Sequence, residues 1–273
     1  MNTEELKALP RASFKNPPLV EVAASVQFEH PLGINTLDMA NIWSSFDRKR
    51  FSRYREMPPL DPLLPQNTHL IEMSPLPPMR RYWFETEQQD ALIQLQQDRL
   101  IYNWKRPPSN FNDQNCYPRY EKVIAAFFEY YGKLIKFLED RQLQSSNPSY
   151  LGLTYINLIE IPENGLGVIG KVFKDINLMG KERLLPAPQN IHHTWFFQVP
   201  DLPISLKTDL STRQRVHDGS KTLQYELSVT GPISDFSYAG MQDWFKNAHL
   251  WITHGFVDAT SNEMHKEWEK QIC

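Results

Sequence analysis

Residues 20–29 read VEVAASVQFE, and along them apolar side chains alternate with polar or small ones. This is the period of a β-strand that buries one of its two faces. The apolar face holds Val20, Val22, Ala24, Val26 and Phe28. Prolines stand on both sides of the stretch, at positions 17–18 and 31. The pattern therefore predicts a half-buried strand over residues 20–28.

Helical and strand-like patterns follow this strand in turn. From Asn35 the apolar spacing is that of a helix, with Thr36 available as its N-cap. The stripe of this helix is Leu37, Ile42, Trp43 and Phe46. After a proline-rich connector over 57–78, which contains an apolar run at 69–73, residues 82–87 and 91–106 predict a hairpin that turns at 88–90. Pro118 then opens a long amphipathic helix, whose stripe is Tyr120, Val123, Ile124, Phe127, Tyr131, Leu134 and Leu138.

The same order recurs in the rest of the chain. Alternation over 151–161 predicts a strand that ends at Pro162, as the first strand ends before Pro31. Residues 193–199, 204–215 and 222–230 are strand-like, and Gly231-Pro232 ends the last of them. A final helix carries the stripe Met241, Trp244, Phe245, Ala248, Trp251, Ile252 and Phe256. We therefore expect an α+β fold of two similar halves, 1–145 and 146–273, each with an antiparallel sheet and a long amphipathic helix, related by a pseudo-two-fold axis with a crevice between them.

Composition excludes several classes of protein. Lys+Arg 29 against Asp+Glu 32 gives a net charge of 29 − 32 = −3, which provides no general attraction to nucleic acid or to an anionic membrane. Two cysteines, Cys116 and Cys273, are too few for a disulfide framework. The first residues hold no apolar run of the kind found in signal peptides, and no stretch predicts a membrane span. A cytoplasmic protein is the expectation.

Several stretches resemble a sporadically distributed family of uncharacterised bacterial and archaeal proteins of this length. The resemblance rests on NPPLVEV (16–22), LIQLQQDRLIYNW (92–104), YPRYE (117–121), LTYIN (153–157) and a last helix with Ala248-His249, Phe256, Thr260, Glu263-Met264 and Trp268. It covers nearly the whole chain. It implies no catalytic residues, and the family's patchy occurrence is typical of genes on mobile elements or in defence islands.

Aromatic side chains in polar surroundings are the candidate binding residues. Tyrosine, tryptophan and arginine are the usual anchors of binding surfaces. The set is Tyr102, Trp104, Tyr117, Arg119, Tyr120 and Trp195. The alternative is a core rich in large rings, to which the same residues would belong.

A basic patch at the end of the first predicted helix is the candidate for nucleic-acid contact. It consists of Arg48, Lys49, Arg50, Arg53 and Arg55, interleaved with Phe46, Phe51 and Tyr54. Cations that alternate with aromatic rings suit phosphates and stacked bases. Cations are also common at helix C-termini, where the dipole favours them, and the acidic balance of the chain favours this second interpretation.

Motifs for catalysis, metals and cofactors are weak. The run GLGVIG (165–170) has the letters of a dinucleotide fingerprint but lacks the acidic residue about 20 residues further on. His192-His193 beside Trp195, and His249 with His254 and Asp258, come nearest to a metal or acid–base site. The spacing of His254 and Asp258 suits a metal pair or a solvent-exposed hydrogen bond equally well, but no His-Glu-x-x-His or paired-cysteine spacing supports metal. His249 is expected to be a packed core histidine. Cys116 has no neighbouring histidine, and Glu85 and Glu87 are expected to be solvated edge charges. We therefore predict no catalytic residues, no metal and no cofactor.

These observations favour a non-enzymatic binding or adaptor protein, in a mobile or defence-related locus, that works with a protein partner or as a homo-oligomer. Two alternatives stay open. One is a hydrolase or nucleotide-processing enzyme with its site between the halves, and the other is a nucleic-acid binder that uses the basic patch.

Overall fold

The computed structural model describes residues 1–63, 79–110, 116–161, 169–174, 176, 188–215 and 219–272. Its helices are α1 (Thr3–Lys7), α2 (Met39–Ser45), α3 (Tyr120–Asp140), α4 (Ile169–Val172), α5 (Tyr238–Ala259) and α6 (Asn262–Glu267), with 3₁₀ turns at Thr36–Asp38 and Pro108–Asn110. Its strands are β1 (Ala12–Phe14), β2 (Leu19–Phe28), β3 (Arg53–Met57), β4 (Arg81–Glu85), β5 (Ala91–Gln96), β6 (Arg99–Lys105), β7 (Pro148–Glu160), β8 (His192–Gln198), β9 (Ser205–Gln214), β10 (Lys221–Pro232) and β11 (Lys270–Ile272).

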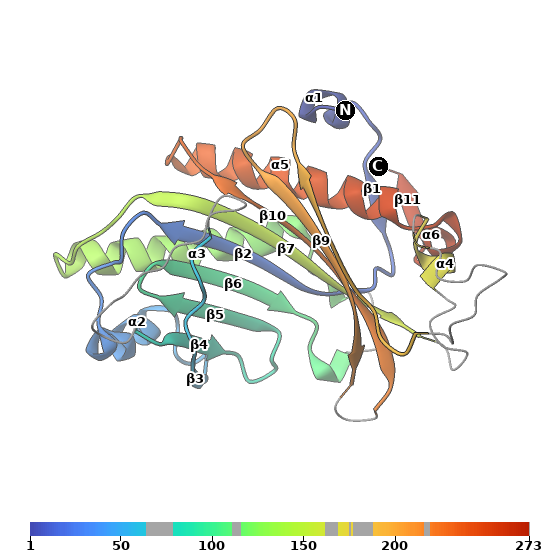
Figure 1. Cartoon of the computed structure of the whole chain (residues 1–273). Coiled ribbons are helices and arrows are strands. Elements are labelled where there is room, and N and C mark those ends of the chain that lie inside the picture. The colour runs from blue at the N-terminus through green and yellow to red at the C-terminus, as the bar shows by residue number, and fades with distance from the viewer. Residues whose placement is uncertain are drawn as a thin grey trace.

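Nine of these strands form one antiparallel sheet, in the order β3-β4-β5-β6-β2-β7-β10-β9-β8 (Figure 1). The predicted α+β class is confirmed. The sheet is continuous rather than divided between two halves, because β2 pairs with β7 along almost its whole length. Both strands are therefore central, and their sequences alternate because one face of each packs on the core.

A glycine lies at the junction of β2 and β7. Gly152 on β7 lies opposite Ser25 on β2, and a Cβ atom at Gly152 would lie 2.6 Å from the Ser25 Oγ atom. A side chain there would force the serine to move. A small residue at position 152 therefore lets the two strands pair with Ser25 in its present position.

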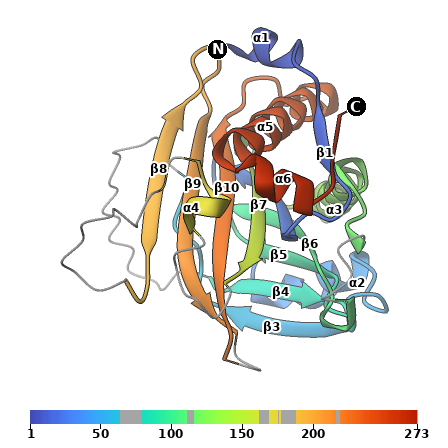
Figure 2. The ribbon, with the colours of Figure 1, turned by 90° about the vertical axis from the view of Figure 1, so that its right-hand side faces the viewer.

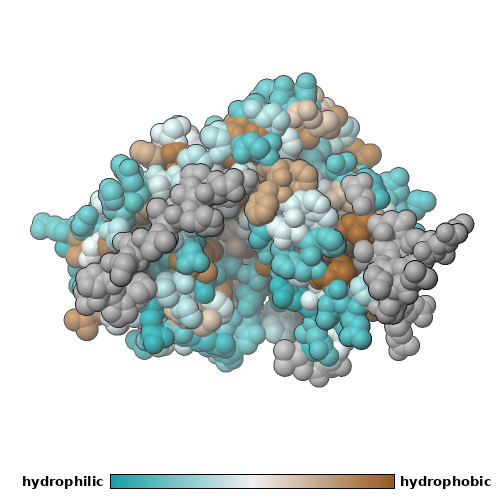
Figure 3. Space-filling view, in the orientation of Figure 1, coloured by the Kyte–Doolittle hydropathy of each residue, from teal (hydrophilic) through white to brown (hydrophobic). Residues whose placement is uncertain are grey.

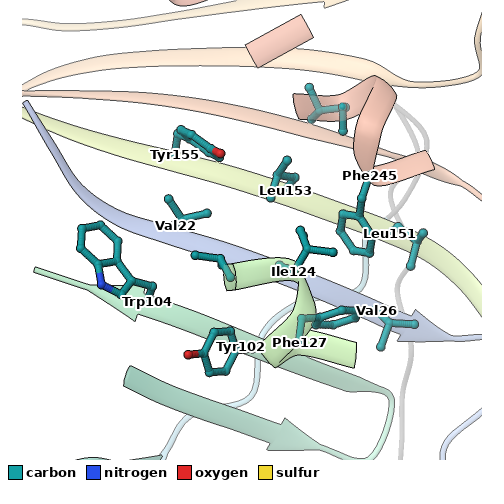
Figure 4. Packing of buried hydrophobic residues seen from close by; sticks show 14 of the residues in the cluster. Val22, Val26, Tyr102, Trp104, Ile124, Phe127, Leu151, Leu153, Tyr155 and Phe245 are labelled. Carbon is teal, nitrogen blue, oxygen red and sulfur yellow. The ribbon is translucent and has the colours of Figure 1, made fainter. Parts of the chain in front are cut away.

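Both long helices cover the same face of the sheet (Figure 2). The apolar faces of β2, β6 and β7 point toward α3 and α5, and the core fills the space between them (Figure 4). Phe127 of α3 meets Phe245 of α5 with ring centroids 5.1 Å apart. The two helices therefore share one hydrophobic core above the central strands.

No described helix covers the opposite face of the sheet (Figures 1 and 2). The described residues that Figure 3 shows on this side are mostly hydrophilic, with hydrophobic patches among them. On it, the segment that follows β3 is held by a glutamine clamp, which consists of Gln27, Gln96 and Arg99. Gln27 accepts from the Leu63 N–H (2.6 Å) and donates to the Leu63 carbonyl (3.1 Å). Gln96 makes the same pair of bonds with Leu60, at 2.9 and 3.2 Å. Each side chain thus behaves as a strand backbone would toward its neighbour.

Three local predictions need correction. The helix at Asn35 is capped by Asn35 itself, whose side chain accepts from the Leu37 N–H, rather than by Thr36, and Leu37 is 85% exposed. That helix ends at Ser45, so Arg53 and Arg55 of the basic patch lie on the edge strand β3. The segment 91–106 is not one strand, because it turns at residues 97–98 to give β5 and β6. The apolar run at 69–73 lies outside the described residues.

The described parts of the two ends of the chain lie side by side, since β1 and β11 form a separate two-stranded sheet. Asn2 caps α1, and the Thr3 hydroxyl donates to Asp201 (2.9 Å). No helix in the described part of the chain is long and apolar enough to cross a membrane.

Candidate binding site

A cavity of about 440 Å³ lies where β1, β7, α5 and the start of α3 meet. We call it the aromatic cavity. Its walls include the side chains of Phe14, Tyr117, Arg119, Tyr120, Tyr155, Asn157, His249, Thr253 and Phe256. Three of the predicted binding residues, Tyr117, Arg119 and Tyr120, are therefore brought together here. They come from the segment before α3 and face residues that lie far along the chain.

Two tyrosine hydroxyls meet in the wall of the cavity. The Tyr117 and Tyr155 oxygens lie 3.0 Å apart, within hydrogen-bond distance. Burial raises the pKa of both phenols, so both remain protonated at neutral pH. One of the two hydroxyls donates to the other, and the acceptor keeps its own proton for a further bond. Trp104, another predicted residue, is buried behind Tyr117 with ring centroids 5.0 Å apart.

His249 provides the second polar ring of the cavity. Its imidazole stacks on the Tyr120 ring at a centroid distance of 4.0 Å and lies 5.8 Å from Tyr155. Burial, with a smaller contribution from Arg11, lowers the pKa of His249 to about 3. The ring is therefore neutral at pH 7, with one donor and one acceptor nitrogen. The expectation of a packed histidine fits its burial, but this histidine also lines a cavity.

Arg119 lies at the N-terminus of α3 in a backbone conformation that other residues avoid. Its φ of 79° and ψ of 156° fall in a region used almost only by glycine. A non-glycine residue there costs about 1–3 kcal/mol. The guanidinium donates to the Phe14 carbonyl of β1 at 3.3 Å, which fixes the side chain at the cavity. Strain of this kind is concentrated at functional sites.

Neutral polar groups complete the lining. The Asn157 amide donates to the Tyr225 carbonyl (3.2 Å), which satisfies only one of its two N–H groups. The Thr253 hydroxyl donates back to the helix carbonyls of His249 and Leu250. Arg119 and Glu121 are the charged residues of the lining and have opposite signs. The cavity can therefore hold a flat, mostly apolar ring and offer it several uncharged hydrogen-bonding groups.

The other predicted binding residues lie elsewhere. Tyr102 belongs to the core, where its ring stacks on Tyr130 at 5.6 Å. Trp195 lies on the edge strand β8, on the wall of a second cavity of about 610 Å³ between α1, α5 and β8. Sequence reasoning missed Tyr155, Asn157 and His249 as site residues. Tyr155 and Asn157 belong to a predicted strand and to the LTYIN stretch (153–157), and His249 was considered, but as a packed core histidine rather than as part of a site.

Contacts within the chain engage most of the basic patch. Arg48 stacks on Trp43 at 4.4 Å, and Arg50 donates to the Tyr130 hydroxyl at 3.1 Å. The remaining pairs are Arg53 with Glu87 (3.6 Å) and Arg55 with Glu85 (3.8 Å). Glu85 is buried, with 4% of its surface exposed, and also pairs with Lys105 at 3.2 Å. The interpretation of Glu85 as a solvated edge charge was therefore wrong.

Except for His249, the residues considered for metals and cofactors are not among those that line the aromatic cavity. His192 pairs with Asp209 at 2.9 Å on the outer strands, and His254 and Asp258 line the second cavity. No group of three or more potential metal ligands occurs among the described residues. Most of the glycine run 165–170 lies outside the described residues, and its last two positions begin α4.

Comparison with known proteins adds no assignment. No protein-family model matches the chain, and no curated protein matches it in sequence.

Proposed function

We propose that the chain is a binding protein whose ligand is a small, uncharged, ring-containing molecule held in the aromatic cavity. The observation that carries this proposal is the stack of neutral His249 on Tyr120 beside the Tyr117–Tyr155 hydroxyl pair. Ring faces of this kind bind flat ligands, and the few polar groups orient them. The cavity volume of about 440 Å³ suits a molecule of that size.

Binding is favoured over catalysis by the state of the polar groups. His249 is a weak base, since burial lowers its pKa to about 3, and the Thr253 hydroxyl is bonded to the helix backbone. His249 is therefore poorly suited to take a proton from a nucleophile at neutral pH, and the Thr253 hydroxyl donates its proton to the helix backbone rather than to a base. A hydrolase or nucleotide-processing enzyme remains the alternative. Turnover of generic ester or phosphate substrates that is lost in a His249→Phe variant would favour it.

The experiment is a binding titration with defined probes, indole as an uncharged ring with a donor, benzoate as an anionic ring and benzylamine as a cationic ring. We expect saturable binding of indole that Tyr120→Ala weakens at least about tenfold, because the stacking face is lost. Tyr54→Ala is the matched control, since Tyr54 is exposed on β3 and does not line the cavity. Preference for benzoate or benzylamine over indole would contradict the proposal.

We also infer that the chain arose by internal duplication. Counted outward from the β2–β7 pair, the strand orders β2-β6-β5-β4 and β7-β10-β9-β8 correspond, and α3 and α5 follow β6 and β10 in the chain. β3 then has no counterpart. The test is superposition of residues 19–138 on 150–268, and helices that failed to superpose with their strands would exclude duplication.

The basic patch remains a second candidate site, for nucleic acid. Its arginines already have partners in the chain, which favours a structural role. If the patch binds phosphates, affinity should fall with salt by roughly 0.7–0.9 log units per contact for each log unit of salt. Reversal of Arg48 and Lys49 to Glu would then abolish binding. A defence-related or mobile locus, a protein partner and a cytoplasmic location also stay predictions.

A further inference from the structure

The outer strand β8 is an unusual sheet edge. It pairs with β9 on one side, and no described strand pairs with its other side. Its sequence, HHTWFFQ, contains no Lys, Arg, Asp, Glu or Pro. Trp195, Phe196 and Phe197 are 36%, 59% and 49% exposed. Edge strands are usually protected by charges, proline or bulges, so this strand lacks the features that prevent pairing with another chain.

Alternate residues of β8 direct their backbone N–H and C=O groups away from β9. Thr212 donates to the Ile191 carbonyl and Val199 donates to the Ile204 carbonyl, and both pairs fit the β8–β9 register. Because hydrogen bonding alternates along an antiparallel ladder, odd-numbered residues direct their backbone groups toward β9. The even-numbered residues 192, 194, 196 and 198 therefore direct theirs outward.

The side chains of β8 are complementary to a copy of themselves. If two β8 strands pair antiparallel with Trp195 on the two-fold axis, Thr194 faces Phe196 and His192 faces Gln198. These are the residues with outward backbone groups, so their N–H and C=O groups can pair across the axis. Trp195 meets its own copy at a non-hydrogen-bonded position, where side chains are closest, and His193 faces Phe197. No like charges oppose one another in this pairing. A second copy therefore fits this uncharged edge better than a partner whose own edge strand is charged.

We propose that the protein is a homodimer in which two β8 strands join the sheets of two copies, with Trp195 at the two-fold axis. The pairing also covers Trp195 and Phe197, which form one wall of the second cavity. The surface is separate from the aromatic cavity, so the proposal does not depend on the proposed ligand.

The first test is sedimentation velocity of the full chain from roughly 1 to 100 μM. We expect a concentration-dependent dimer, and we expect Phe196→Lys to weaken it at least about tenfold by placing a charge on the edge. Phe236→Lys is the matched control, because Phe236 is 45% exposed in the loop before α5. Circular dichroism would establish that both variants fold. A monomer throughout this range, or a dimer unaffected by Phe196→Lys, would overturn the proposal.

The second test determines the register. In a Cys116→Ser, Cys273→Ser background, Trp195→Cys should form an intermolecular disulfide with oxidised glutathione, because position 195 faces its own copy. Phe196→Cys should not, because position 196 faces position 194. The double variant Thr194→Cys, Phe196→Cys should crosslink again. Crosslinking of Phe196→Cys alone, or none with Trp195→Cys, would exclude this dimer.

Discussion

At the scale of single residues, the wall of the aromatic cavity combines features that are unfavourable to folding. His249 gives up hydration to stack on Tyr120, and Arg119 adopts a backbone conformation that suits glycine. Both features cost free energy that packing elsewhere must offset. Each therefore leads to a measurable effect, on the pH dependence of stability for His249 and on stability and binding for Arg119.

His249 should make the fold sensitive to acid. Its pKa is lowered to about 3, whereas the unfolded chain takes up the proton near 6.5. Stability is therefore complete above about pH 6.5 and is lost as pH falls toward 3, with a slope of at most about 1.4 kcal/mol per pH unit. We expect His249→Phe, which keeps a ring, to lose less stability than the wild type between pH 7.5 and 5 in urea denaturation.

His265, whose pKa burial lowers to about 4, remains in both proteins and contributes a slope of the same sign. The variant should therefore reduce the acid sensitivity without removing it. His30→Phe, at an exposed position, is the control and should follow the wild type. If His249→Phe and the wild type lose stability in parallel, then His249 is not held neutral by the fold.

Arg119 should show stability and binding changing in opposite directions. Arg119→Gly removes the strain at φ 79° and also the bond to the Phe14 carbonyl, whereas Arg119→Ala removes the bond and keeps the strain. We therefore expect the glycine variant to be more stable than the alanine variant by about 1–2 kcal/mol. Both should bind indole more weakly than the wild type. Equal stability of the two variants would show that the backbone is not strained.

The Tyr117–Tyr155 pair should behave as a coupled unit. Removal of either hydroxyl leaves the other without its partner in a buried place, at a cost of about 1–3 kcal/mol. We expect the double variant Tyr117→Phe, Tyr155→Phe to cost less than the sum of the two single variants. A double-mutant cycle from urea unfolding measures this coupling, and additive costs would mean that the two hydroxyls do not interact.

At the scale of elements, the sequence pattern predicted a strand where one face of that strand is buried and the other is less buried. Alternation revealed β2 and β7 because each has one buried face. It missed β3 because Arg53–Met57 is a mostly exposed edge strand, and it missed the turn after β5 because all six residues of β5 are buried and no glycine or proline marks residues 97–98. Tyr117, Arg119 and Tyr120 were predicted as binding residues, but His249, which lines the same cavity, is over 120 residues away, and only tertiary packing brings it to them.

The glutamine clamp should protect the backbone amides of the segment after β3 from exchange. Gln27 and Gln96 each hold one residue of this segment by two hydrogen bonds. Replacement of both by Leu should loosen residues 58–63, because it removes these four bonds and leaves the bond from Arg99 to the Asp61 carbonyl (2.8 Å). We expect faster amide exchange at Leu60 and Leu63, with β2 and β5 still protected.

Gln94→Leu is the control for this double variant. Gln94 also lies buried on β5, but it bonds to Arg81, Trp83 and Asn103 rather than to this segment. Unchanged exchange at Leu60 and Leu63 in the Gln27→Leu, Gln96→Leu variant would mean that the clamp does not hold the segment.

At the scale of the whole molecule, the continuous sheet makes the two parts of the chain depend on each other. Separation of 1–145 from 146–273 would turn β2 and β7 into two unpaired sheet edges with apolar side chains. It would also remove the contact of Phe127 with Phe245. Exposed apolar edges of this length aggregate. We expect each fragment alone to be unfolded or insoluble, and the two fragments together to recover the native circular dichroism spectrum.

The intact chain should unfold in one step for the same reason. Fluorescence, which reports on three tryptophans in the first part and four in the second, among them Trp104 and Trp244, should follow the same urea transition as far-UV circular dichroism. Single-tryptophan variants separate the two signals, and their midpoints should coincide. Two separate midpoints would show that the parts fold independently, so that the β2–β7 pair joins two domains without making them one cooperative unit.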